Sequence, residues 1–83
     1  MTPAERHEAK LRELVEQAGF VLAVSIDVAN RFRIVEVINN EWSLVAWAST
    51  SSQGFDVVFP RTQVRATTPT ALVDELEKWK EQS

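Results

Sequence analysis

The sequence predicts a single α+β domain, residues 1–83, in which a helix at each end packs on one face of an antiparallel sheet. Three observations indicate this fold: a helix-start signal near each end, apolar residues at three- and four-residue spacing after each signal, and a central stretch rich in β-branched and aromatic residues. At 83 residues the chain is long enough for one hydrophobic core and too short for two. We therefore expect one domain with a three- to four-stranded meander sheet.

The N-terminal helix is expected to cover about residues 3–18. Thr2 and Glu5 have the spacing of a capping box, and Pro3 stands at the first helical position. Gly19 supplies the left-handed residue that commonly ends a helix. The residues expected on its apolar face are Leu11, Leu14, Val15 and Ala18.

The C-terminal helix repeats this pattern and should run to about residue 81. Thr68 is the expected N-cap and Pro69 the first helical residue. The charged residues of this segment have the spacing of a solvated helix face. The residues expected on its apolar face are Leu72, Val73, Leu76 and Trp79.

Short polar breaks separate the predicted strands of the central region. Two breaks end in Asn30 and Asn40, and Asn tolerates the left-handed conformation that closes a three-residue hairpin loop. We therefore predict three-residue loops at both places. Arg61–Thr67 is compatible with an edge strand or with an extended approach to the second helix. The predicted strands are Phe20–Val28, Arg31–Ile38, Glu41–Ser49 and Phe55–Pro60.

The loop length fixes the register, and a shift of one residue turns a strand over. Two-residue turns are disfavoured here, because they would place Arg31 and Arg33 among aliphatic side chains. With three-residue loops, Glu36 is the only charged residue on the core face. The other residues expected there are Leu22, Val24, Ile26, Phe32, Ile34, Ile38, Trp42, Leu44, Ala46, Ala48, Phe55, Val57 and Phe59.

The opposite face of the sheet is expected to carry an apolar patch, whereas a solvent-facing sheet usually alternates with polar residues. Arg31 and Arg33 border the patch, and one guanidinium is expected close enough to lie over the ring of Trp47. The alternative is that a helix or the Arg61–Thr67 segment covers these residues within the monomer. The predicted binding residues are Arg31, Arg33, Val35, Val37, Val45 and Trp47.

Composition limits the classes of function. The chain has no cysteine, which excludes disulfides, thiolate metal sites and thiol nucleophiles. No apolar run approaches the roughly 20 residues of a membrane span, and charged residues follow the first Met closely. We expect a cytoplasmic protein with no membrane partner.

The residues that carry catalytic chemistry are scarce. The only histidine is His7, and the run Ser49–Ser52 has no base beside it in sequence. A phosphate-binding glycine loop is excluded, because the only glycines are Gly19 and Gly54. The sequence therefore predicts no enzyme, no catalytic residue, no metal and no cofactor.

Nucleic-acid binding is the alternative function, with Arg31, Arg33 and Trp47 as the contacting residues. The order helix–sheet–helix resembles that of double-stranded RNA-binding domains. The basic cluster that this family carries at the start of its second helix is replaced here by the residues 67–71, Thr-Thr-Pro-Thr-Ala, so the family's function is not carried over. The net charge of −3 also disfavours contact with a polyanion.

The function predicted first is that of a small non-catalytic interaction or regulatory module. Accessory proteins of phages and mobile elements are of this size and kind. The module is expected to bind a protein partner, or a second copy as a homodimer, through the sheet face around Trp47. Trp and Arg are enriched among the residues that dominate binding at protein interfaces.

Overall fold

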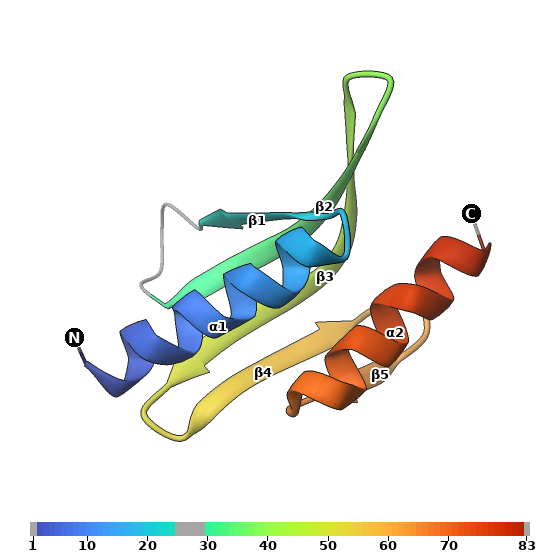
Figure 1. Cartoon of the computed structure of the whole chain (residues 1–83). Helices are drawn as coiled ribbons and strands as arrows, with labels where there is room; N and C mark the ends of the chain where they lie inside the picture. The colour runs from blue at the N-terminus through green and yellow to red at the C-terminus, as the bar shows by residue number, and fades with distance from the viewer. Residues whose placement is uncertain (1, 25–29, 83) are drawn as a thin grey trace.

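The computed structural model describes residues 2–24 and 30–82 and has the predicted α+β fold. Its five strands form one antiparallel sheet in the order β1-β2-β3-β4-β5, one strand more than the upper predicted number. The end of the first predicted strand, from Ser25, and the loop before Asn30 lie outside the described residues. The elements in Figure 1 are α1 (Pro3–Gln17), β1 (Val21–Val24), β2 (Arg31–Ile38), β3 (Glu41–Ser51), β4 (Gly54–Phe59), β5 (Val64–Ala66) and α2 (Pro69–Gln82).

Both helices begin at the caps that the sequence predicts. The backbone N–H of Glu5 donates to Thr2 Oγ1 at 3.2 Å, and the Glu5 carboxylate accepts from the backbone N–H of Thr2 at 3.4 Å. In α2 the backbone N–H of Ala71 donates to Thr68 Oγ1 at 3.2 Å. These bonds satisfy backbone donors that a helix leaves free in its first turn.

Gly19 ends α1 and turns the chain into the sheet. Its φ of +90° is the left-handed conformation that glycine adopts without strain. The N–H of Gly19 donates to the carbonyl of Glu16, and the N–H of Phe20 donates to the carbonyl of Val15, each at 3.0 Å. This pair of bonds is a Schellman motif, and it sends the next residues directly into β1.

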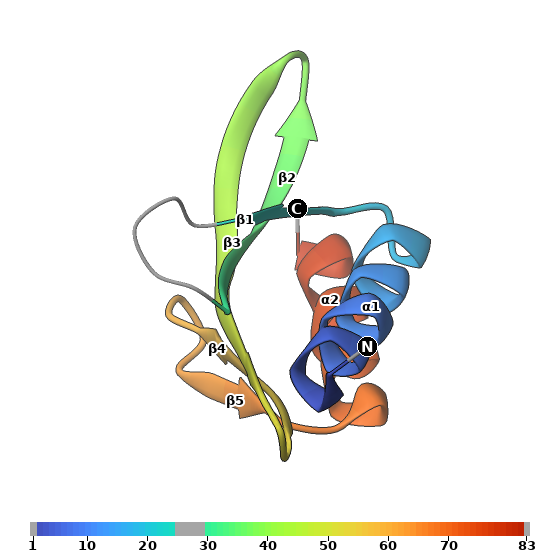
Figure 2. The ribbon, with the colours of Figure 1, turned by 90° about the vertical axis from the view of Figure 1, so that its left-hand side faces the viewer.

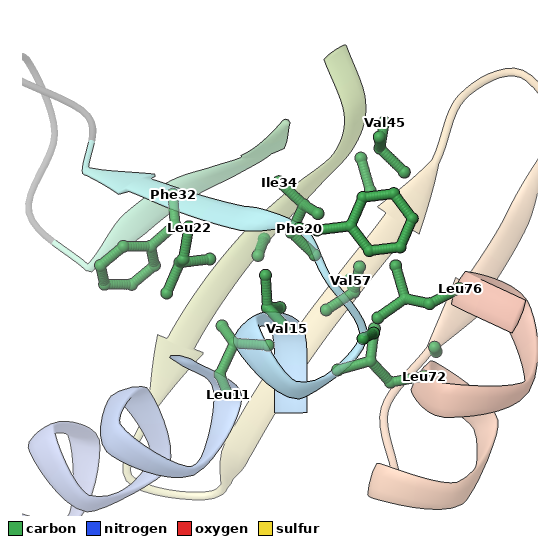
Figure 3. Packing of buried hydrophobic residues seen from close by; sticks show 14 of the residues in the cluster. Leu11, Val15, Phe20, Leu22, Phe32, Ile34, Val45, Val57, Leu72 and Leu76 are labelled. Atoms are coloured by element: carbon green, nitrogen blue, oxygen red, sulfur yellow. The ribbon is translucent and has the colours of Figure 1, made fainter. Parts of the chain in front are cut away.

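The two helices lie on the same side of the sheet, as predicted (Figure 2). They bury their apolar faces against it and leave the other sheet face without a helix. Ala66 of β5 belongs to this core, and the Arg61–Thr67 segment therefore contains an edge strand. The core residues are Leu11, Val15, Ala18, Phe20, Leu22, Phe32, Ile34, Val45, Ala46, Ala48, Phe55, Val57, Phe59, Ala66, Leu72 and Leu76 (Figure 3).

The turn between β2 and β3 differs from the prediction. It has two residues, Asn39 and Asn40, with φ of +54° and +67°, and Ile38 pairs directly with Glu41. Positive φ at both central residues is the requirement of a type I′ hairpin turn, which Asn tolerates better than other side chains. The predicted three-residue loop at this place is therefore wrong.

A β-bulge in β3 reconciles the short turn with the rest of the sheet. Near the turn, Val35 pairs with Leu44, but the next residue of β2, Ile34, pairs with Ala46. Val45 is the extra residue of the bulge, and from there on the residues of β3 lie on the faces predicted for them. Arg31 thus stays on the face away from the helices, although the turn has only two residues.

The two-residue turn reverses the faces of the residues between it and the bulge, three of which are apolar. Trp42 and Leu44, predicted in the core, share a face with Val37 and Val35 on the side away from the helices. Val45, predicted on that side, is fully buried in the core. The physical reason is the period of two in a strand: every residue between the turn and the bulge is reversed relative to a three-residue loop.

Two further residues predicted in the core are exposed because the core ends before them. Val24 lies at the end of the described part of β1, and Ile38 lies beside the turn. Glu36 has the face that was predicted for it, but it lies beyond the last core residue of β2 and is half-buried. Register alone therefore does not decide burial near the ends of strands.

The turn lies at the end of a projecting ribbon formed by residues 35–44. The pairing of β1 with β2 ends at Val35, and the pairing of β4 with β3 begins only at Trp47. Figures 1 and 2 both show the β2–β3 hairpin extending past the helices. The end of this ribbon is thus a pair of strands without further described strands beside it.

Candidate binding surface

The candidate site lies on the sheet face opposite the helices, called here the open face. Residues paired across antiparallel strands share a face, so the register assigns the members of the site directly. Arg33 pairs with Trp47, Val35 with Leu44, and Val37 with Trp42. Val21 of β1 joins them, because it pairs with Val35.

An exposed apolar patch extends over the open face from the β2–β3 turn to Trp47. Trp42 is 64% exposed and Trp47 is 49% exposed, although tryptophan is highly buried on average. Large apolar side chains gathered on one face are typical of contact surfaces. The patch, as defined here, consists of Val21, Val37, Trp42, Leu44 and Trp47.

A shallow hollow of about 460 Å³ lies within this surface. Val35 is only 7% exposed although it faces away from the helices, because its neighbours on three strands surround it. The exposed ring of Trp42 stands at the edge of the hollow. The residues that line it are Ala23, Arg33, Val35, Trp42, Leu44 and Trp47.

The guanidinium of Arg33 lies over the indole of Trp47, with Cζ 5.9 Å from the ring centroid. This is the contact that the sequence analysis expects, and cross-strand pairing of the two residues explains it. Arg31 lies two residues before Arg33 in β2, opposite Ser49. The border of the patch nearest the start of β2 is therefore cationic.

The other two arginines of the central region are engaged elsewhere. Arg65 forms an ion pair with Asp56, with Nε 3.2 Å from Oδ1. Arg61 lies over the ring of Trp79 on α2, with Cζ 5.2 Å from the centroid. Arg31 and Arg33 make no ion pair with any residue among 2–24 and 30–82.

The open face brings together five of the six predicted site residues, all except Val45. It adds Trp42 and Leu44, which sequence reasoning placed in the core. Two signals in the sequence point to these residues. The pair of asparagines suits a two-residue turn, and the five consecutive apolar residues 44–48 interrupt the alternation of the strand, as a bulge can.

Neither described helix covers the open face, and β5 lies at the edge of the sheet. Among the described residues, neither a helix nor the Arg61–Thr67 segment shields the patch, so this alternative is wrong for them (Figure 2). The patch is therefore solvent-exposed within the described residues.

The same residues offer neither a metal site nor a membrane-spanning helix. In the part of the chain that the structure describes, no three His, Cys, Asp or Glu side chains gather in a way that would hold a metal ion. None of the described helices has the length and apolar character needed to cross a membrane. Comparison with models of protein families, with curated proteins and with solved structures found no match to this chain.

Proposed function

We propose that this protein is a small non-catalytic interaction module that binds a protein partner, or a second copy of itself, through the open face around Trp47. The observation that carries the proposal is the exposed apolar patch with Arg33 on the Trp47 ring. The largest apolar patch on the surface of a monomeric protein is often functional. The proposal keeps the accessory or regulatory role and the cytoplasmic location inferred from the sequence.

The composition of the surface supports binding of a protein. A central apolar area with Trp and Arg, bordered by polar residues, is the arrangement of interface hot spots. Trp47 is the member of the apolar patch that lies beside the arginines, Arg31 and Arg33. The expected cost of truncating Trp47 is about 2 kcal/mol of binding free energy or more.

Nucleic-acid binding through Arg31, Arg33 and Trp47 is the second candidate. The stacked guanidinium and indole favour it, because bases stack on such groups. The ion pair of Arg65 with Asp56 weighs against it, since it removes one cation from the phosphate-binding potential of the face. Retention on single-stranded DNA or RNA that falls steeply with salt would favour this candidate.

Photo-crosslinking in cells tests the proposal. A photo-reactive phenylalanine analogue replaces Trp42 on the open face in one variant and Glu77, an exposed residue of α2, in a matched control. The proposal predicts discrete protein adducts from position 42 and none from position 77. Adding Trp47→Ala to the first variant should remove the adducts while the protein stays folded.

Two outcomes would contradict the proposal. Equal adducts from both positions would mean that the open face has no preference for a partner. Adducts with nucleic acid alone would replace the protein partner by the second candidate.

A further inference from the structure

The open face carries both an exposed ring and a hollow, which is an arrangement that can pair with itself. Trp42 stands out from the ribbon near the turn, whereas the hollow extends down to Arg33 and Trp47. A two-fold axis brings the same patch of two copies together, so that each contact occurs twice. A ring at one end of the patch and a hollow towards the other satisfy that symmetry.

We propose that the occupant of the open face is a second copy of this chain, packed sheet to sheet with the ribbon turn of each copy over the Arg31–Arg33 end of the other. Each Trp42 then enters the hollow of its partner beside Arg33. This inference deepens the proposed function and rests on it. It commits to self-association, which the proposed function leaves open.

The area of the patch fits a dimer. A whole tryptophan side chain offers about 250 Å², and the exposed fractions of the five patch residues then amount to roughly 450 Å² of apolar surface per copy. Two facing patches bury roughly 900 Å² of apolar surface. Because apolar atoms make up about 65% of homodimer interfaces, the whole interface would bury about 1,400 Å². Stable interfaces bury about 1,200–2,000 Å².

The charges along the hairpin favour the antiparallel arrangement. Arg31 and Arg33 lie on the open face at the start of β2, whereas Glu36 and Glu41, the charged residues nearer the turn, lie on the opposite face of the ribbon together with Ile38. A parallel arrangement would place arginines beside arginines. Turn over base keeps the arginines of the two copies apart, which lowers the electrostatic cost of association.

The ribbon itself gains from a second copy. An isolated pair of strands is marginally stable in water, and this one exposes Val37 and Trp42 on one face and Ile38 on the other. Packing the open face of the ribbon against another sheet removes the first two side chains from water. The partner thus completes an element that the monomer leaves uncovered.

Light scattering coupled to size-exclusion chromatography tests the inference. The wild type should have twice the chain mass of 9.4 kDa. Trp42→Ala, which removes a largely exposed side chain, should remain folded and raise the dimer dissociation constant by about 30-fold or more, which corresponds to the loss of one hot spot.

Charge substitutions at Val37 test the arrangement of the two copies, because Val37 lies on the open face of the ribbon near the turn. Val37→Lys would face the partner's Arg31 and Arg33 and should shift the protein towards monomer, whereas Val37→Glu would face opposite charges and should retain the dimer. Glu77→Lys on α2 changes the charge away from the face and should leave the dimer unchanged.

The outcomes separate this inference from the proposed function. A wild type that stays monomeric at high concentration, or a dimer that survives both Trp42→Ala and Val37→Lys, overturns the second copy as occupant. Equal effects of Val37→Lys and Val37→Glu overturn the turn-over-base packing. In a monomeric wild type, tryptophan fluorescence that acrylamide quenches readily leaves the open face free for another protein, whereas shielded rings also overturn the proposed function.

Discussion

At the scale of single residues, the contact of Arg33 with Trp47 joins the charged and apolar parts of the site. The side chains sit on neighbouring strands in direct register, so the sheet and not a flexible loop holds the guanidinium over the ring. Such a contact at an exposed site contributes about 0.5–1 kcal/mol. Its main consequence is the fixed position of two groups that dominate protein interfaces.

Arg33→Gln should therefore lower the free energy of unfolding by no more than about 1 kcal/mol, while it weakens binding at the open face. Urea unfolding measures the first effect, and the yield of adducts from a photo-reactive residue at position 42 measures the second. Arg61→Gln is the matched control, because it removes the contact with Trp79 on α2 and leaves the open face intact. Equal loss of adducts in both variants would contradict a specific role of Arg33.

The residue pattern predicted this contact because it lies on the side of the bulge where the residues have the predicted faces. Arg31 and Arg33 were assigned correctly by their exclusion from the core. Trp42 was not, since an indole suits the core and an interface equally well, and only the register decides between them. Its exposure follows from backbone geometry several residues away.

At the scale of elements, the helices were predictable because their signals are local. Caps formed by Thr2 and Thr68 and the left-handed Gly19 depend on neighbouring residues only. The length of the β2–β3 turn and the position of the bulge depend on each other, and together they place the residues after Val45 on the same faces as the predicted three-residue loop would. Alternation alone does not separate these two solutions.

The type I′ turn gives a test at this scale. Asn40→Val should destabilise the protein by about 1–2 kcal/mol, because a β-branched side chain opposes the left-handed conformation that the turn requires. Asn40→Gly should be tolerated, as glycine accepts this conformation without strain. Thermal unfolding of both variants distinguishes them, and similar losses of stability would contradict the two-residue turn.

At the scale of the whole molecule, the two faces of the sheet have separate tasks. One face holds both helices and the core, and the other exposes the patch and the hollow. The ribbon extends the second face beyond the part of the sheet that the helices stabilise (Figure 1). Binding and folding thus draw on different residues of the same strands.

If a second copy covers the open face, stability should depend on protein concentration. The midpoint of thermal unfolding of the wild type should rise as the concentration increases, because association stabilises the folded state by mass action. The midpoint of Trp42→Ala should be nearly independent of concentration. A wild-type midpoint that stays constant over the same range would contradict self-association.

Equilibrium urea unfolding of Val45→Ala and Trp42→Ala, at dilutions where both are monomeric, tests the arrangement on which the site depends. Val45 is fully buried and Trp42 largely exposed, so we predict that Val45→Ala loses about 2 kcal/mol and Trp42→Ala loses less than about 1 kcal/mol. The reverse order would place Trp42 in the core and Val45 on the surface. The open face would then lack its exposed patch, and the proposed binding surface would be wrong.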